Sequence, residues 1–278
     1  MNPLRRFTYR PGVLCLARFL RLTDSLRNVY WRCTVSRNGI FHTRIEGGVD
    51  IQFRAHTPEE LRDIEVRFLT ERDFLQVLTS GLRLGDVFLD VGSYIGLFTI
   101  PVAKAVGEHG QVIAFEPESN NHKRLVDNVK LNGLRNVRVF RKALGERSGG
   151  GKLFLAGSGS SLLAHAGDAD QQSASEAVEI AAWDELLQIE GLPVPRAVKI
   201  DVEGYEYAVL RGMQRTLAQQ ACQLLCVEIH PSFLPGNLRP EDVIGLVESL
   251  GFTRFEIYPR LTTTHLVASK GEGAHGPP

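Results

Sequence analysis

Residues 86–96 read D-V-F-L-D-V-G-S-Y-I-G, and this stretch predicts a buried strand over residues 87–91, a glycine turn and a helix over about residues 97–106. Gly92 permits a sharp turn from strand to helix, and Gly96 permits a ligand or the strand to approach the first helical turn closely. Asp90 ends the strand, so its carboxylate is expected at the mouth of an α/β crevice. Open parallel sheets bind nucleotide-like ligands in such crevices.

The spacing of this turn, Asp-x-Gly-x-x-x-Gly, differs from the three-glycine dinucleotide fingerprint Gly-x-Gly-x-x-Gly. An acidic side chain beside the turn repels a pyrophosphate and attracts a cation. S-adenosylmethionine carries an ammonium group and a positive sulfur, so it is the ligand that this stretch favours. A parallel strand that ends in Asp-x-Gly without any ligand is the alternative.

The composition is typical of a soluble globular protein, with 43% hydrophobic and 23% charged residues among 278. Basic and acidic residues are equal in number, so no overall field recruits nucleic acid. The sequence shows neither a signal peptide nor an apolar segment of membrane-spanning length. Cys15, Cys33, Cys222 and Cys226 match neither a zinc site nor a disulfide framework, so we expect reduced thiols and a cytoplasmic protein.

Residues 1–40 contain eight arginines and a single acid, Asp24. Apolar residues between them predict a basic amphipathic helix that contacts a membrane surface or a partner protein. A solvated helix packed on the main domain is the alternative. The sequence is also compatible with assembly of the protein into a homo-oligomer.

After residue 80, strands alternate with helices, as expected for a parallel sheet with helices on both faces. The further predicted strands are residues 112–115, 137–141, 178–181, 197–200 and 224–229, and residues 254–258 and 265–269 form a closing antiparallel hairpin. The predicted helices are residues 119–131, 183–189, a segment that ends near 217, and 241–250. Residues 145–177 are rich in Gly, Ser and Ala and predict loops around a short strand over residues 152–155. Before residue 80, a hairpin is predicted within residues 39–56, followed by a helix that Thr57 caps and Pro58 starts and that continues to residue 78.

Acidic residues end four of the five strands that lead into the crevice: Asp90, Glu116, Asp201 and Glu228. Lys142-Ala143-Leu144 follows the remaining strand, and His230 lies on the same side of its strand as Glu228. Glu116 comes 26 residues after Asp90, near the offset at which an acid binds ribose hydroxyls in dinucleotide folds. We therefore expect Glu116 to bind the ribose, with a solvated strand end as the alternative.

Residues 199–206 read K-I-D-V-E-G-Y-E, and period-two alternation places Lys199, Asp201 and Glu203 on one side while the chain stays extended. A lysine in a buried strand is costly unless paired, so Lys199 is expected to reach an acid in the crevice. An intra-strand charge pair is the alternative, with Glu206 as an acid that favours the helix dipole.

The motifs V-F-L-D-V-G-S-Y-I-G, V-I-A-F-E-P, N-V-R-V-F-R-K-A-L-G, V-K-I-D-V-E-G-Y-E and C-V-E-I-H occur in this order between about residues 80 and 235. In this the chain resembles the FkbM-type methyltransferase family. The resemblance implies a Rossmann-like class I methyltransferase fold with a mainly parallel, doubly wound sheet and a C-terminal antiparallel hairpin. It also implies S-adenosylmethionine as cofactor and O-methylation of a hydroxyl on a small molecule, natural product or sugar.

The resemblance also implies site residues. The donor turn is carried by Asp90, Gly92 and Gly96, with Ser93 and Tyr94 inside it. Glu116 holds the ribose and Pro117 follows it, Ala143 and Leu144 border the adenine, and Asp201 lies near the methyl group.

Two positions depart from the family pattern. Ser93-Tyr94 stands where the family often has Ala-Asn, and Tyr94 is expected to stack over or wall off the donor. Trp183 is expected either on the acceptor side or in the core.

Three parts are predicted along the chain. They are an N-terminal extension over residues 1–80 that serves the acceptor side or an interaction, a methyltransferase domain over residues 81–270, and a disordered tail over residues 271–278.

An alcohol acceptor must lose its proton at or before methyl transfer, and a general base contributes about 10²- to 10⁴-fold to such a step. The candidates are His230, Asp201 and Glu228; we favour His230 because its unperturbed pKa, about 6.5, is the most suitable. Lys199 completes the predicted catalytic group. The same side chains are able to bind a divalent ion, but no metal is expected.

The sequence disfavours three other functions. A nucleotide-dependent oxidoreductase is disfavoured because the middle glycine is missing and Asp90 stands beside the turn. A non-catalytic binding protein is disfavoured because Asp90, Glu116 and Asp201 occur together. Methylation of nucleic-acid bases is disfavoured because no N-P-P-Y motif is present.

Overall fold

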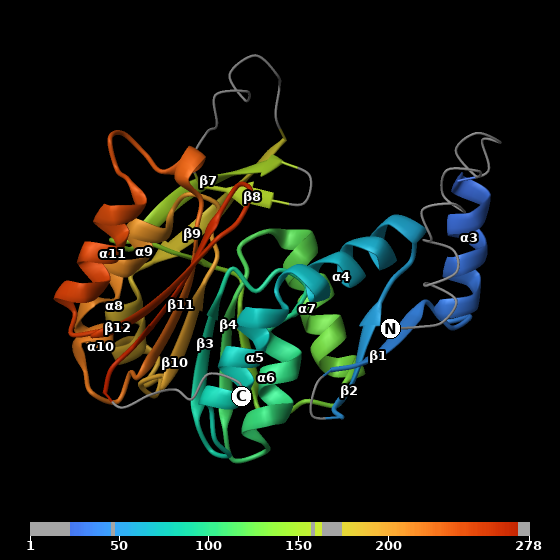
Figure 1. Cartoon of the computed structure of the whole chain (residues 1–278), viewed down its shortest axis with the longest axis horizontal. Helices are drawn as coiled ribbons and strands as arrows, with labels where there is room; N and C mark the ends of the chain where they lie inside the picture. Colours follow the sequence, from blue (N-terminus) through green and yellow to red (C-terminus); the bar gives the residue numbers. More distant parts are fainter. Residues whose placement is uncertain (1–22, 46–47, 157–158, 163–173, 272–278) are drawn as a thin grey trace. The chain divides into compact units, whose positions relative to one another are not determined.

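The computed structural model describes residues 23–45, 48–156, 159–162 and 174–271 (Figure 1). The chain divides into two compact units, Met1–Arg72 and Asp73–Pro278, which we describe separately. The apolar residues of the predicted basic helix, Leu14 to Leu22, and residues 272–278 of the predicted tail lie outside the described residues. The roles predicted for the N-terminal extension stay predictions.

The first unit contains the predicted hairpin, in which β1 (Ile40–Arg44) pairs antiparallel with β2 (Asp50–Arg54). Helix α3 (Thr23–Thr34) precedes the hairpin and α4 (Pro58–Thr70) follows it. Thr57 caps α4 as predicted, because its side chain accepts the backbone N–H of Glu60 at 3.2 Å. The predicted continuous helix is wrong: α4 ends at Thr70, and α5 (Arg72–Gly81) begins after Glu71.

A seven-stranded sheet in the order β12-β13-β11-β10-β3-β4-β5 organises the second unit. Strand β13 is antiparallel to both of its neighbours, whereas the remaining pairs are parallel, which confirms the predicted fold class. The last strand thus inserts between the two that precede it. The strands are β3 (Val87–Val91), β4 (Gln111–Phe115), β5 (Val137–Phe140), β10 (Ala197–Ile200), β11 (Leu224–Ile229), β12 (Arg254–Pro259) and β13 (Thr264–Ser269).

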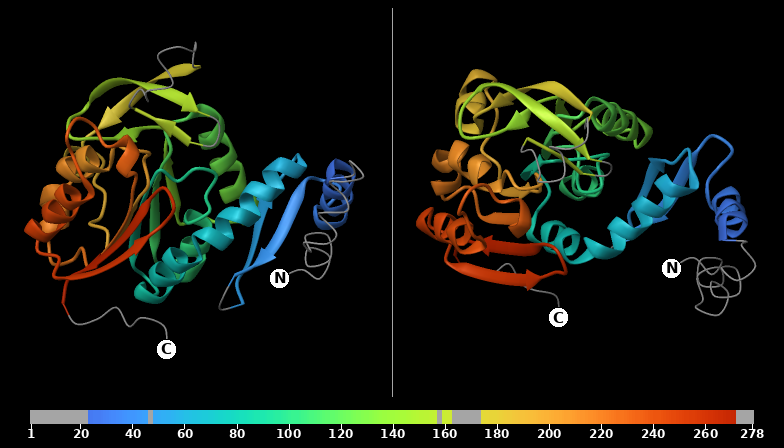
Figure 2. Two further views of the ribbon diagram at one scale, coloured as in Figure 1. Left: turned by 45° about the horizontal axis from the view of Figure 1, so that its top comes forward. Right: turned by 90° about the horizontal axis from the view of Figure 1, so that it is seen from above.

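Helices cover both faces of this sheet, as the views in Figures 1 and 2 show. The face that carries Asp90 packs against α5, α6 (Thr99–Val106) and α7 (Ser119–Leu131). The opposite face carries Leu89, Ile113 and Val198, and this larger core packs against helices α8–α11. These helices are α8 (Trp183–Ile189), α9 (Glu206–Gly212), α10 (Gln214–Ala218) and α11 (Pro240–Ser249).

The helix predicted to end near residue 217 is interrupted at Met213, between α9 and α10. A Cβ at Gly212 would lie 1.9 Å from the carbonyl oxygen of Gly145, so the last residue of α9 touches another backbone segment. This close packing is not visible in the helical pattern of the sequence.

The predicted short strand over residues 152–155 is confirmed as part of a longer strand, but the loops predicted around it are wrong at residues 149–151, 159–161 and 175–177. Residues of this region form a separate four-stranded sheet in the order β6-β9-β7-β8, in which β7 is antiparallel to both β8 and β9. Gly149, Gly150 and Gly151 pair with strand β9 through their backbones, although their composition suggested a loop. The strands are β6 (Ala143–Leu144), β7 (Gly149–Ala156), β8 (Gly159–Ser161) and β9 (Ser175–Ala181).

Cys222 and Cys226 are buried free thiols, as predicted. Within the described part of the chain, no helix is long and apolar enough to cross a membrane.

Gly92 is the position where the fold tolerates a side chain least. Its φ is +78°, and a Cβ there would lie 1.8 Å from the carbonyl oxygen of Asp201. We predict that Gly92→Ala lowers the free energy of unfolding by about 3 kcal/mol or more, measured by urea denaturation.

Gly133 provides the control, because its φ is +66° and no atom lies within 4 Å of a built Cβ. Gly133→Ala should cost only the left-handed backbone penalty of about 1 kcal/mol. Equal losses in the two variants would show that the contact between Gly92 and Asp201 is unimportant.

Candidate active site

Lys199 lies at the centre of the candidate site, on the central strand β10. Strand register places it opposite Asp90 of β3, on the face that α6 covers. Its Nζ lies 3.5 Å from Asp90 Oδ1 and 3.4 Å from Asp201 Oδ2, and donates to the carbonyl oxygen of Gly92 at 2.8 Å. Lys199 therefore reaches two acids, as predicted. Burial alone would lower its pKa, but Asp201, Asp90 and Glu228 hold the pKa above its usual value.

Asp90 is completely buried beneath the glycine turn rather than open at its mouth. Its Oδ2 accepts a hydrogen bond from the Thr99 hydroxyl at 2.6 Å, and its Oδ1 faces Lys199. The carboxylate thus links the first residue of α6 to strand β10. Its predicted contact with a donor stays a prediction.

The turn after Asp90 is held by hydrogen bonds to the backbone of β4 and of Asp90. The N–H groups of Gly92 and Ser93 both donate to the carbonyl oxygen of Phe115, at 3.0 and 2.9 Å, and the Ser93 hydroxyl donates to the carbonyl oxygen of Asp90 at 2.8 Å. Tyr94 adopts a φ of +51°, which is uncommon for a residue other than glycine. This conformation aims the N–H of Tyr94 at Glu116.

Gly96 makes room for neighbouring helices. A Cβ at this position would lie 2.9 Å from Leu125 of α7 and 3.2 Å from Ile100 of α6. The close approach that the sequence indicated at Gly96 is therefore made by helix side chains.

Glu116 directly follows β4 and is a buried carboxylate with two backbone donors. Its Oε2 accepts the N–H of Tyr94 at 2.8 Å and its Oε1 accepts the N–H of Glu118 at 3.0 Å. Burial raises its pKa to about 8, although both N–H groups oppose this shift. Glu116 is thus held rigidly beside the turn, with two oxygens that suit a pair of vicinal hydroxyls.

His230 directly follows β11 and is surrounded by acids. Its Nδ1 lies 2.8 Å from Glu206 Oε1, while its Nε2 lies 3.3, 3.9 and 4.0 Å from Glu203, Glu228 and Asp201. Burial alone would lower the pKa of His230, but the hydrogen bond with Glu206 and the charges of Asp201 and Glu203 raise it to about 9. The imidazole is therefore protonated at neutral pH in the free protein.

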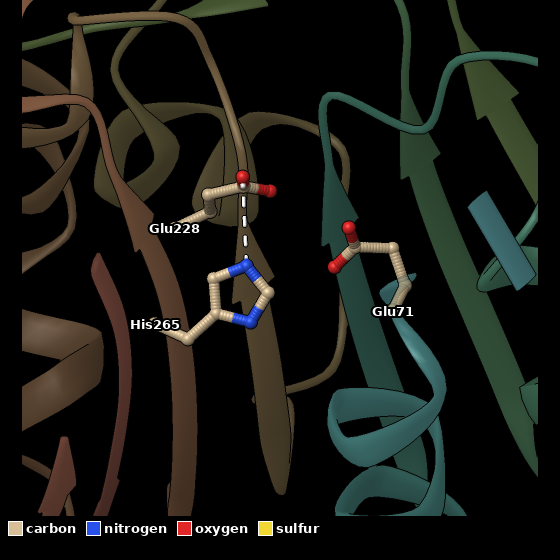
Figure 3. A group of neighbouring side chains, drawn as sticks. All are labelled: Glu71, Glu228 and His265. Carbon is tan, nitrogen blue, oxygen red and sulfur yellow. Dashed lines mark ion pairs between the residues drawn. The ribbon is translucent and has the colours of Figure 1, made fainter. Parts of the chain in front are cut away.

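Glu228 forms a second pair beside His230, with His265 of β13 (Figure 3). The two residues are opposite each other in the antiparallel register, and His265 Nε2 lies 3.5 Å from Glu228 Oε1. Burial opposes ionisation of Glu228. The hydrogen bond from His265 and the nearby charges of His230 and Lys199 nevertheless keep its pKa below the usual range.

The small sheet reaches this site through β8. The Ser161 hydroxyl donates to the carbonyl oxygen of Glu203 at 2.7 Å, and the Ser160 hydroxyl donates to Glu118 Oε2 at 2.7 Å. Both Glu203 and Glu118 lie just beyond the carboxyl ends of strands, β10 and β4 respectively. Strand β8 therefore lies at the carboxyl edge of the main sheet.

Some predicted site residues come together and others do not. Asp90, Lys199, Asp201, Glu228 and His230 form one chain of charge contacts. Ala143 and Leu144 are buried in β6, where they pair with Ile180 and Ala181 of β9. Their predicted contact with an adenine, and that of Pro117 with the donor, stay predictions. Trp183 lies in the core, where its Nε1 donates to the Thr216 hydroxyl at 3.0 Å, so it is not an acceptor wall.

The structure also contains residues that sequence reasoning missed, chiefly Thr99, Glu206 and His265. A signal for Glu206 was present, because it precedes Val209, Leu210 and Met213 at the i+3, i+4 and i+7 spacing of a buried helix face. A carboxylate at such a position needs a partner in the interior. Glu203 was expected on an extended chain, but its φ is +52°, and a turn brings it to His230.

These residues fit a cationic ligand. Asp201, Glu203 and Glu228 remain partly accessible around the site and outnumber the two buried cations, Lys199 and His230. This excess of carboxylates suits the positive ammonium and sulfonium groups of S-adenosylmethionine. The two oxygens of Glu116 are suited to accept hydrogen bonds from its ribose hydroxyls. Asp201, Glu203 and His230 also place one ligand atom each within 4.8 Å of one another, close enough to hold a divalent ion.

Comparison with known proteins shows which sequences this chain resembles. Residues 90–253 match the Methyltransferase FkbM domain. Hexuronic acid methyltransferase AglP of Haloferax volcanii is 30% identical over 204 residues, which cover 72% of this chain and 77% of that protein.

Solved structures of low sequence identity were also found. A SAM-dependent O-methyltransferase from Thermotoga maritima is 12% identical, with 86% of this chain and 95% of that chain covered and a TM-score of 0.46. A SAM-dependent methyltransferase from Aquifex aeolicus is 17% identical, with 75% and 96% covered and a TM-score of 0.42. Because both scores are below 0.5, the assignment depends on the domain match and on AglP.

The buried lysine provides a test of the site's electrostatics. We predict that Lys199→Met lowers the free energy of unfolding by about 3 to 5 kcal/mol, because Asp90 is then buried without its counter-charge. The double variant Lys199→Met/Asp90→Asn should recover about 1 to 3 kcal/mol of this loss in urea denaturation.

Lys123→Met is the matched control, since Lys123 forms an exposed pair with Asp127 at 3.6 Å. It should change the free energy of unfolding by about 0.5 kcal/mol or less. A similarly small effect of Lys199→Met would contradict the central role of the buried pair.

Proposed function

Because the chain belongs to the FkbM family of methyltransferases, we propose that it transfers a methyl group from S-adenosylmethionine to a hydroxyl oxygen of a sugar or sugar acid. The observation that carries the hydroxyl acceptor is His230 Nε2, an imidazole nitrogen among three partly accessible carboxylates at the carboxyl edge of the sheet. Carboxylates accept hydrogen bonds from sugar hydroxyls, and the imidazole nitrogen accepts the proton. The similarity to hexuronic acid methyltransferase AglP supports a sugar acid as the acceptor class.

The donor is bound at the turn after β3. Glu116 accepts hydrogen bonds from the ribose hydroxyls, and residues 92–96 line one side of the donor site. When bound, S-adenosylmethionine supplies a methyl group that is already activated by its positive sulfur. The protein's main task is therefore alignment, which contributes roughly 7 to 11 kcal/mol to such reactions.

The acceptor is bound beside Asp201, Glu203 and Glu228. Neutral His230 takes the hydroxyl proton at Nε2, and the resulting imidazolium is stabilised by the same acids that raise its pKa. The proton then returns to solvent after product release. Lys199 does not touch the acceptor; it keeps Asp201 in place from beneath.

We place the protein in the cytoplasm because its buried Cys222 and Cys226 are free thiols. A membrane, protein or second-copy contact through residues 1–40 stays a prediction.

Incubation with isotope-labelled S-adenosylmethionine and separate acceptors tests the function. The panel contains a hexuronic acid, the matching neutral hexose and a simple hydroxy acid, and mass spectrometry detects the product. We expect methylation of the sugar acid that survives mild alkali, as an ether does. An alkali-labile product would instead be a methyl ester, which would overturn the hydroxyl acceptor, and no product with any member would overturn the acceptor class.

Calorimetry measures the affinity of two matched variants for S-adenosylmethionine. Glu116→Gln should weaken S-adenosylmethionine binding about 10- to 100-fold, because one of the two acceptor oxygens is replaced by an amide NH₂ that cannot accept a ribose hydroxyl. Glu108→Gln changes an exposed acid in the turn before β4, at the other end of the sheet, and should leave the affinity unchanged.

The pH dependence tests His230 as the base. Its neutral form is required and its pKa is about 9, so kcat/KM should rise about tenfold per pH unit from pH 7 and level off near pH 9. His230→Asn should lower kcat by about 10²- to 10⁴-fold and remove this rise, with donor affinity unchanged. A flat profile in the unchanged protein would assign proton transfer to a carboxylate.

A further inference from the structure

Glu206 is a fully buried carboxylate in contact with His230. It is the first residue of α9, and its Oε1 accepts the N–H of Gly204 at 2.8 Å while lying 2.8 Å from His230 Nδ1. Its Oε2 is buried and has no hydrogen-bond partner. Burying a carboxylate in this way is unfavourable, and buried ion pairs seldom stabilise a fold more than apolar residues would. The arrangement therefore calls for a reason other than stability.

An ionised carboxylate only accepts hydrogen bonds, so a 2.8 Å contact with Glu206 requires the proton to be on Nδ1. When His230 loses one proton, the lone pair must then be on Nε2. This nitrogen faces Glu203, Glu228 and Asp201, which lie where the proposed acceptor is bound.

A second contact restricts the ring from another side. The ring of Phe233 is nearly parallel to that of His230, with centroids 6.0 Å apart, and the N–H of Phe233 donates to the carbonyl oxygen of His230 at 2.9 Å. Gly204 lies against the same segment, because a Cβ there would be 2.5 Å from the carbonyl oxygen of Phe233. The turn that bonds Glu206 thus also packs against the segment that carries the imidazole.

We infer that Glu206 is a positioning residue for methyl transfer, which keeps the proton of His230 on Nδ1 and directs the basic Nε2 toward the acceptor hydroxyl. The inference rests on the proposed function, in which Nε2 takes the hydroxyl proton. During transfer the acceptor O–H bond breaks and an Nε2–H bond forms. Glu206 accepts the hydrogen bond from Nδ1 before and after this step and thereby stabilises the imidazolium that results.

Nuclear magnetic resonance of the full chain labelled with ¹⁵N in histidine tests the inference without donor or acceptor. The His230 signals are identified by their loss in His230→Gln, and the ring is followed from about pH 7 to about pH 10. We expect the neutral ring to carry its proton on Nδ1. In Glu206→Gln, a large fraction should carry it on Nε2, the tautomer that a free histidine side chain prefers.

Glu203→Gln is the matched control, because Glu203 is near the other ring nitrogen at 3.3 Å. It removes the same charge but should leave the proton on Nδ1. When an acceptor that the unchanged protein methylates is used as substrate, Glu206→Gln should lower kcat about 10- to 100-fold. The KM for S-adenosylmethionine should change little. If Glu206→Gln does not fold, Glu206→Asp keeps the charge and withdraws the carboxylate by one methylene, and a smaller shift in tautomer is expected.

The outcomes separate the two proposals. An unchanged tautomer in Glu206→Gln overturns the role of Glu206 even if methyl transfer proceeds. A changed tautomer supports that role even if none of the tested acceptors is methylated. A shift of the Nε2 signal on addition of Mg²⁺ or Zn²⁺, with activity lost in a chelator, would make Nε2 a metal ligand and would overturn the inference.

Discussion

The ion pair of Lys199 with Asp90 and Asp201 is the constraint on which the site depends. A lysine in the central strand of a parallel sheet has no access to water, so its charge must be met by side chains of the same face. Register places Asp90 directly opposite it, and Asp201 follows two residues later along the chain, just after β10 ends. The Lys199 ammonium also binds the carbonyl oxygen of Gly92. The ends of β3 and β10 are thus joined at one point, and the turns that follow them start from fixed positions.

Around His230, the acidic side chains that the structure describes outnumber the basic ones. His230 meets four carboxylates, from Asp201, Glu203, Glu206 and Glu228, and it is therefore protonated in the free protein. The same surplus of negative charge is suited to a positively charged donor, whose arrival would make a proton on His230 less favourable. Electrostatic attraction of the donor and basicity of the imidazole are therefore properties of one set of residues.

Elements with strong periodicity or clear end signals were predicted well. The strands over residues 87–91, 197–200 and 224–229 are short apolar runs, and the structure contains them with the same bounds. Two strands of the small sheet were predicted in part, over residues 152–155 and 178–181. The sheet itself was missed because Gly149, Gly150 and Gly151 pair through backbone groups, which any residue carries. The break at Met213 was missed because its cause is the backbone of Gly145, a segment remote in sequence. The burial of Glu206 was missed because a glutamate at a helix start has an ordinary explanation in the helix dipole.

The sequence by itself determined the order of strands and helices, the acids at the strand ends and the need of Lys199 for a counter-charge. These depend on local spacing, on side-chain alternation and on the cost of burying a charge, all of which are readable along one chain. Only the tertiary structure decided which acid meets which base. Asp90 lies beneath the turn, Glu206 lies against His230 Nδ1, and His265 lies against Glu228, because register between strands and packing of helices bring together residues far apart in sequence. Distances of this kind follow from how elements pair in space, and no single element of the sequence carries that information.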